Sequence, residues 1–226
     1  MKRETNMALY PVFLKLEGRK VLIVGGGPIA QQKIEAVLRS ATDVTVLAPQ
    51  ITPRIRLWAH QGRLKHVALQ YHSGMAQGYF LVIAATDSEP VNRAVYAEAR
   101  ASGALSNSVD DPGYCDFYAP AVVSRGDFQI AISTGGHSPA LAQSVRKDLE
   151  REFGPEYASW TAWLGRMRQA MRHLLPPTER RQAMLRLLAL CRPQASQKSN
   201  TGGNHGRTEK NAAGAQVKTG IERASA

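Results

Sequence analysis

Three small residues at a fixed spacing, Gly25, Gly27 and Ala30, are the first feature of this sequence that indicates chemistry. They follow the apolar run VLIV and precede a segment with helical spacing, which is the context of a dinucleotide-binding turn. In such a turn the first glycine permits a tight bend and the second lets the backbone approach a pyrophosphate. The small third residue lets the helix pack closely on the sheet. The motif therefore predicts NAD or NADP binding, with a glycine-rich turn that holds no ligand as the alternative.

The acidic residue that usually follows the second strand of such a fold, and that binds the adenosine ribose, is missing. The segment VTVLAPQ places Ala48, Pro49 and Gln50 at this point. Ribose contacts would then come from Gln50 or from the backbone. The choice between NAD and NADP stays open on this feature.

A second candidate site is the loop Ser133, Thr134, Gly135, Gly136 and His137, which runs into a predicted helix start. Free backbone N–H groups at a helix start bind anions, so the loop is a candidate site for carboxylates. Histidine is a common acid or base at neutral pH, so His137 is a candidate for that role. A histidine that packs against the helix start or faces water is the structural alternative.

The sequence predicts no disulfide framework and no permanent metal site. Its two cysteines, Cys115 and Cys191, lie far apart and outside any CxxC pattern. The histidines outside the candidate loop show no HxxxH spacing; they are His60, His66, His72, His173 and His205. Cysteine usage of this kind indicates a reducing compartment.

The elements that must position these residues alternate between strand and helix. Strands are predicted at 21–25, 44–48, 63–69, 79–86 and 104–109, and helices at 28–40, 52–61 and 88–102. This rhythm predicts an α/β fold, a Rossmann-like doubly wound parallel sheet. Thr86 and Asp87 end the most apolar strand, at the sheet edge where such folds bind ligands.

The pattern changes after residue 117. Two short β-prone runs, 118–123 and 128–133, flank the predicted turn 124–127 and form a hairpin of a different sheet. Ser138 and Pro139 then predict a helix start, and Leu141, Val145 and Leu149 are expected to line one face of that helix. Helices at 157–174 and 178–190 complete a small C-terminal helical module.

These predictions divide the chain into five parts. They are a leader (1–7), a dinucleotide-binding Rossmann domain (8–117), a hairpin and helix segment (118–150), a helical module (151–192) and a disordered polar tail (193–226). The tail is assigned from its lack of apolar residues.

The chain has 226 residues and a net charge of +11, with the excess heaviest in the C-terminal third. A basic surface favours anionic partners without choosing among them. No apolar run approaches the roughly 20 residues of a membrane-spanning helix, and the polar start MKRETNM is not a secretory signal. We expect a cytoplasmic protein with no membrane or nucleic-acid partner.

Four segments together resemble a known family: LYPVFLKLEGRKVLIVGGGPIAQQK, AATDSEPVN, NSVDDP and FYAPAVVSRGDFQIAISTGGHSPALAQSVRKDLE. They resemble the precorrin-2 dehydrogenase and sirohydrochlorin ferrochelatase family of sirohaem synthesis. The likeness covers residues 8–190, and the run STGGHSPALA is more specific than the glycine motif. Since only a polar tail follows Arg192, the chain is similar to the stand-alone form of the family rather than to the form fused to a methyltransferase.

The resemblance implies NAD-dependent oxidation of precorrin-2 to sirohydrochlorin. Insertion of ferrous iron, as a substrate and not a bound cofactor, would then give sirohaem. The cofactor NAD would be bound by Gly25, Gly27, Pro28, Ile29, Ala30, Pro49, Gln50, Thr86 and Asp87.

The resemblance also assigns roles to individual residues. Asp110 matches the aspartate that the family uses as general base. The local sequence alone equally allows Asp110 a role in a turn, for which Asp111 is the better candidate. Asn107 and the loop 133–137 would contact the substrate, with a capping or turn role as the alternative for Asn107. In related enzymes the position that matches Thr134 is a serine open to phosphorylation, and a threonine also carries a hydroxyl group. The segment 118–150 matches the family's homodimer region.

Three other functions are compatible with the sequence. The first is a precorrin-2 dehydrogenase without chelatase activity. The second is a non-enzymatic, NAD-sensing regulator whose basic part binds nucleic acid, although no helix-turn-helix spacing is present. The third is a dehydrogenase for another substrate, against which the STGGHSP run argues.

Overall fold

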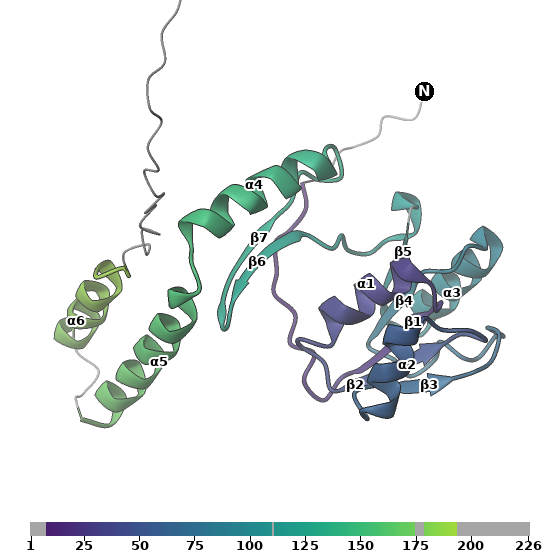
Figure 1. The fold of residues 1–226 in the computed structure, drawn as a ribbon, viewed down its shortest axis with the longest axis horizontal. Helices are drawn as coiled ribbons and strands as arrows, with labels where there is room; N and C mark the ends of the chain where they lie inside the picture. The colour runs from purple at the N-terminus through teal and green to yellow at the C-terminus, as the bar shows by residue number, and fades with distance from the viewer. Residues whose placement is uncertain (1–7, 110, 175–178, 194–226) are drawn as a thin grey trace, which may run out of the picture.

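A computed structural model of the chain describes residues 8–109, 111–174 and 179–193 (Figure 1). The predicted leader at 1–7 lies outside the described residues. So do Asp110 and all of the predicted tail except Pro193.

Five parallel strands form one sheet in the order β3-β2-β1-β4-β5. Their bounds are β1 Lys20–Val24, β2 Asp43–Leu47, β3 Lys65–Val67, β4 Leu81–Ala84 and β5 Leu105–Ser108. The chain leaves the edge strand β3, passes β2 and β1, and continues as β4 on the other side of β1. This is the Rossmann order, so the predicted doubly wound parallel sheet is confirmed.

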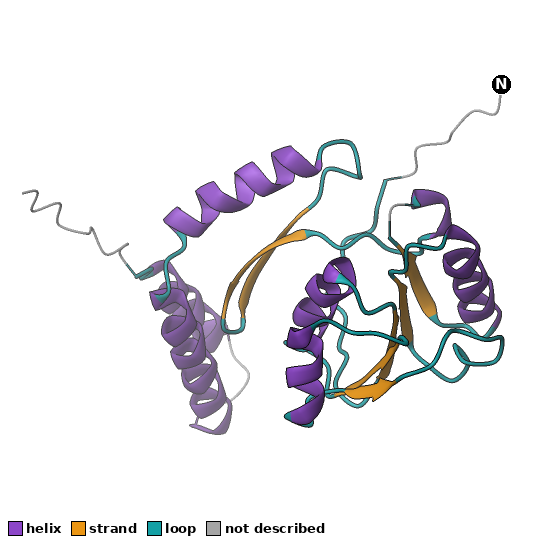
Figure 2. Cartoon of the chain, turned by 45° about the vertical axis from the view of Figure 1, so that its right-hand side comes forward, coloured by secondary structure: helices purple, strands orange, loops and turns teal. Residues whose placement is uncertain are grey.

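Helices cover both faces of this sheet (Figure 2). The residues of β1 alternate between the two faces, as the period of two in a strand requires. Val21 and Ile23 pack with α1 (Pro28–Val37) and α2 (Pro53–His60). Leu22 and Val24 pack with α3 (Glu89–Ala101). All four side chains are almost fully buried, and each such burial contributes roughly 1.5–3 kcal/mol to stability.

Glu98 on α3 holds the segment that crosses from β3 to β4. The backbone N–H groups of Gly74 and Ala76 donate to its carboxylate at 2.9 and 2.8 Å, and the Tyr71 hydroxyl also donates to it. Burial opposes ionisation of this carboxyl group, but these hydrogen bonds outweigh it and lower the pKa of Glu98. Burial and the bond to Glu98 raise the pKa of Tyr71.

Strands β6 (Ala121–Arg125) and β7 (Phe128–Ile132) form the predicted hairpin, in a separate antiparallel sheet. The first strand begins at Ala121 and not at residue 118, since Pro120 precedes it and lacks a backbone donor. The turn is also shorter than predicted, because Ser124 and Arg125 still pair with β7. Gly126 takes the left-handed conformation that this turn needs, with φ of +60°.

Three helices follow the hairpin: α4 Pro139–Glu152, α5 Glu156–Leu174 and α6 Glu179–Leu190. The predicted cap of α4 is confirmed, since the Leu141 N–H donates to Ser138 Oγ at 3.2 Å. The predicted face of α4 is wrong at one position. Leu141 is 55% exposed, and Ala142 is the buried residue. The inward stripe therefore runs through 142, 145 and 149, a spacing of three and four residues.

The Arg125 side chain joins the hairpin to α4. Its guanidinium donates to the carbonyls of Glu150 and Phe153 at the end of α4, where helix carbonyls lack partners within the helix. Phe128, Phe153 and Tyr157 pack their rings 5.1–5.3 Å apart beside it. Figures 1 and 2 show the hairpin, α4 and the α5–α6 pair as a second part beside the Rossmann part. Within the described residues no helix is long and apolar enough to cross a membrane.

Candidate functional site

The carboxyl ends of four neighbouring strands meet at one edge of the parallel sheet. Backbone bonds extend the ladder beyond the strands: Gly25 N–H to Leu47 O at 3.0 Å, Ala85 N–H to Val24 O at 2.8 Å, and Val109 N–H to Ala84 O at 2.9 Å. The segments 25–27, 48–50 and 85–87 are thereby held side by side. The structure thus brings together the three groups of residues predicted to bind the cofactor.

Gly25 and Gly26 have no room for a side chain. Gly25 has φ of +125°, and a Cβ there would lie 2.2 Å from the Ala85 carbonyl oxygen. A Cβ on Gly26 would lie 2.0 Å from the carbonyl oxygen of Gln50. The turn is therefore packed tightly between the ends of β2 and β4. The spacing of the motif alone assigns no role to Gly26, because the contact of Gly26 depends on where the segment 48–50 lies.

Gly27 differs from its neighbours, because a Cβ there would meet nothing within 4 Å. It is the N-cap residue of α1, and no side chain caps this helix. Pro28 occupies the first helical position, Ile29 is 48% exposed beside it, and Ala30 is fully buried against the sheet. Open space before an uncapped helix start suits a pyrophosphate, so the residues present fit a dinucleotide.

Asn92, on the first turn of α3, fixes the end of β4. Its Oδ1 accepts from the Thr86 hydroxyl at 2.7 Å and from the Thr86 N–H at 3.2 Å, while its Nδ2 donates to Thr86 O. Asn92 is buried, whereas Asp87, which follows Thr86 in the chain, is exposed. The role of Asn92 was not predicted from the sequence. The signal for it was an amide side chain on the face of the predicted helix that packs against the sheet.

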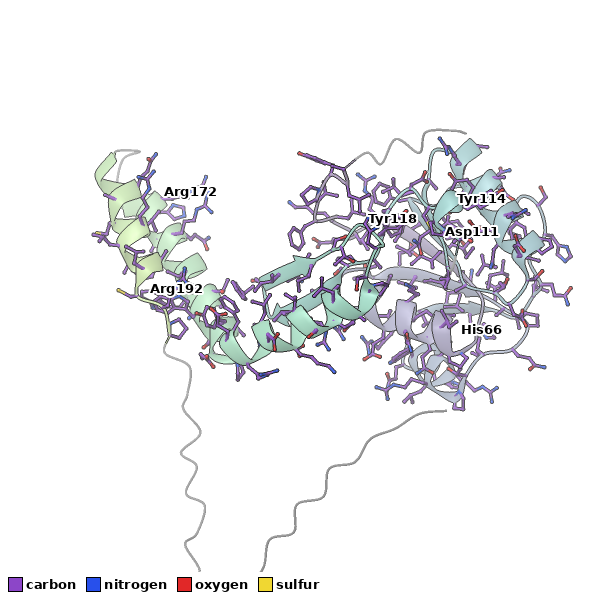
Figure 3. All side chains as sticks on the ribbon, turned by 90° about the horizontal axis from the view of Figure 1, so that it is seen from above. His66, Asp111, Tyr114, Tyr118, Arg172 and Arg192 are labelled. Atoms are coloured by element: carbon purple, nitrogen blue, oxygen red, sulfur yellow. The ribbon has the colours of Figure 1, made fainter. Side chains whose placement is uncertain are left out.

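The segment after Asp110 is fastened to α3. Asp111 Oδ1 accepts from the Gly113 N–H at 3.2 Å at the start of the short 3-10 helix η1 (Pro112–Tyr114), so the predicted turn role of Asp111 is confirmed. The Arg93 guanidinium lies over the Tyr114 ring at 5.1 Å and 3.9 Å from Asp111 Oδ2. Asp111 and Tyr114 are labelled together in Figure 3. Asp110 itself lies outside the described residues.

Asn107 is buried beneath the same segment. Its Nδ2 donates to Phe117 O at 2.9 Å, and it pairs with Cys115 as an isolated β-bridge. Burial raises the pKa of the Cys115 thiol, which donates to Ser108 O at 3.1 Å. These contacts give Asn107 a structural role, and its contact with the substrate stays a prediction.

The loop 133–137 is shaped by its own hydroxyl groups. Ser133 Oγ accepts from the Gly135 N–H at 3.1 Å, and Thr134 Oγ1 accepts from the Ser138 N–H at 3.0 Å. Gly135 and Gly136 both have positive φ, and His137 is exposed. The loop lies on the hairpin part, apart from the carboxyl edge of the sheet (Figures 1 and 2). One chain thus does not bring this loop to the dinucleotide segments.

The part of the chain that the structure describes contains no group of three or more His, Cys, Asp or Glu side chains placed to hold a metal ion.

The parallel sheet and its glycine turn define a Rossmann-type dinucleotide-binding protein. Residues 12–121 match a family described as putative NAD(P)-binding, and residues 125–152 match the family described as the central part of sirohaem biosynthesis proteins. The solved structure of SirC, a precorrin-2 dehydrogenase, matches with a TM-score of 0.68 and 30% identity. That match covers 80% of this chain and 89% of the SirC chain.

Siroheme synthases are also similar in sequence. Those of Methylobacillus flagellatus and Chromobacterium violaceum are 37% and 35% identical over 74% and 77% of this chain. The match spans only 36% and 37% of the length of these two relatives. The chain belongs to the precorrin-2 dehydrogenase family of sirohaem biosynthesis, and its cofactor is NAD.

Proposed function

We propose that this chain oxidises precorrin-2 to sirohydrochlorin with NAD as the electron acceptor. The observation that carries the proposal is the match to SirC over nearly the whole SirC chain. The glycine turn supports it, because it combines closed packing at Gly25 with open space at Gly27.

The oxidation removes a hydride and a proton from the tetrapyrrole. When bound, NAD supplies the hydride-accepting chemistry. The chain holds the pyrophosphate at the start of α1 and shapes the pocket through Thr86, which Asn92 fixes in place. Asp110 is proposed as the general base that takes the proton. Its chain neighbours at 109 and 111 lie at the same sheet edge as the glycine turn.

Iron insertion is proposed as a second activity at the same site. Ferrous iron replaces the protons of two pyrrole N–H groups, and Asp110 would accept protons in this step as well. The alternative is a dehydrogenase that leaves iron insertion to another protein.

The proposed active form is a cytoplasmic homodimer, a location that suits two free cysteines. In one chain the substrate loop 133–137 lies on the hairpin part, apart from the sheet edge (Figure 2). Arg172 on α5 and Arg192, which follows α6, lie far from Asp111 and Tyr114 (Figure 3). A second chain would supply these groups to the site, where their charge suits the carboxylates of the substrate.

An anaerobic assay tests both activities. Purified chain is mixed with precorrin-2 and NAD, and NADH is followed by its absorbance. Ferrous iron is then added, and sirohaem formation is followed against a sample without protein. Asp110→Asn is compared with Asp111→Asn, because Asp111 lies next in the chain and serves the turn.

We expect NADH from the wild type and a loss of about a hundredfold or more in Asp110→Asn, the scale of general-base catalysis. Asp111→Asn should keep most of the activity. Absence of NADH with the wild type would contradict the proposed oxidation. NADH without faster iron insertion would leave a dehydrogenase alone.

A further inference from the structure

An open cavity of about 660 Å³ lies beside the end of β2, at the outer edge of the Rossmann part. The residues that line it include Pro49 and Gln50, which follow β2, and four basic side chains: Arg56, His60, Lys65 and His66. The proposed oxidation assigns no role to these four basic side chains.

Two contacts join the segment that follows β2 to the glycine turn. The Gln50 carbonyl packs against Gly26, and the Thr52 N–H donates to Gly26 O at 3.0 Å. His66 Nε2 lies 2.9 Å from Ala48 O, which orients the imidazole beside the end of β2. In a Rossmann fold the adenosine ribose of the dinucleotide lies at the end of the second strand. The cavity therefore lies where the 2′ position of that ribose is expected.

The charge of the cavity is the reverse of that in a site selective for NAD. Selective sites place a carboxylate at the end of the second strand, where it binds the ribose 2′-hydroxyl and repels a phosphate. Here Ala48, Pro49 and Gln50 occupy that end. The residues that line the cavity include Arg56 and Lys65 and no carboxylate. An arginine near this position is what accommodates a 2′-phosphate in NADP sites.

We propose that this cavity receives the 2′-phosphate of NADP, so that the chain accepts NADP as well as NAD. Arg56 and Lys65 would bind the phosphate, and His66 would shape the wall next to β2. The inference rests on the proposed function, in which this sheet edge binds a dinucleotide. It adds which dinucleotides the site accepts.

Direct binding tests the proposal without the reaction. Isothermal titration calorimetry of the full chain compares AMP with adenosine 2′,5′-bisphosphate, which differ only in the 2′-phosphate, and NAD with NADP. We expect the bisphosphate to bind about tenfold tighter than AMP. Arg56→Gln and Lys65→Gln should each lower bisphosphate affinity about fivefold and leave AMP affinity unchanged.

Arg63→Gln is the matched control. Arg63 is exposed in the connection between α2, which carries Arg56, and β3, which carries Lys65. It does not line the cavity, so its replacement removes one positive charge and no phosphate contact. Equal affinities of the wild type for AMP and the bisphosphate would overturn the inference. An equal effect of Arg63→Gln and Arg56→Gln would also overturn it, since it would indicate general charge attraction. Failure of NAD itself to bind would reject the dinucleotide site and the inference together.

Discussion

Gly25 and Gly27 belong to one turn, but the structure constrains them for different reasons. A side chain at Gly25 would overlap the Ala85 carbonyl, and its backbone has φ of +125°. A side chain at Gly27 would point into open space, and its φ of −81° is ordinary for any residue. The fold therefore requires the first glycine, whereas the second is proposed to leave space for the ligand.

Alanine at each position should separate these roles. Gly25→Ala is expected to lower the free energy of unfolding by about 2 kcal/mol or more, because it combines backbone strain with overlap. Gly27→Ala should leave that free energy within about 1 kcal/mol and weaken NAD binding about tenfold or more, because the methyl group occupies the space of the pyrophosphate. Urea unfolding and calorimetry measure the two effects. Equal loss of stability in both variants would contradict this division.

The sequence predicted that small residues were needed in this turn, but not the reason for each one. Residue type and spacing are local properties, whereas the overlap at Gly26 depends on the position of the segment 48–50. Asn92 was missed for the same reason, because its role depends on α3 lying against the end of β4. Contacts between distant segments decide such roles.

Among the elements, α3 both covers the sheet and holds the β3–β4 crossing in place through Glu98. The hydrogen bonds on this carboxylate lower the pKa of Glu98, so its charged form is favoured in the folded chain. A carboxyl group with a lowered folded-state pKa stabilises the fold above its unfolded pKa of about 4.5, and the contribution is lost as the pH falls through the folded value.

Glu98→Gln should therefore destabilise the chain by about 1–2 kcal/mol at pH 7. The difference from the wild type should shrink as the pH falls below about 4.5, the ordinary value for the group. Urea unfolding across pH 3–7 measures it. Glu35→Gln is the control, because Glu35 on α1 forms an exposed pair with Arg39, which follows the helix, and exposed pairs contribute about 0–1 kcal/mol. A difference that stays constant with pH would contradict the role assigned to the charge.

Element positions followed from periodicity wherever one face of an element packs on a core. All five strands of the parallel sheet and α1 to α3 lie where alternation predicted them, with ends shifted by a few residues. The phase of α4 did not follow, because Leu141 and Ala142 are both apolar and only the packed partner decides which one turns inward. Pro120 was the overlooked signal for the start of β6.

Apolar side chains are exposed along the N-terminal segment of the described chain and on the hairpin part. Tyr10 and Phe13 are 87% and 65% exposed, and Leu141 on α4 is 55% exposed. In Figure 1 the N-terminal segment runs past the hairpin toward β1. Apolar surface of this kind is typical of an interface, and the proposed homodimer would cover it.

The double variant Tyr10→Glu with Phe13→Glu should convert a dimer into a monomer, because dimerisation would bury two carboxylates. Sedimentation equilibrium at micromolar concentrations measures the mass. Leu69→Glu is the control, since Leu69 is 52% exposed but lies on the Rossmann part, and this variant should remain dimeric.

The monomeric double variant should still bind NAD, because all segments of the glycine turn come from one chain. Its precorrin-2 oxidation should fall about a hundredfold if the partner supplies the loop 133–137 to the site. A wild-type monomer that oxidises precorrin-2 would contradict the proposed assembly.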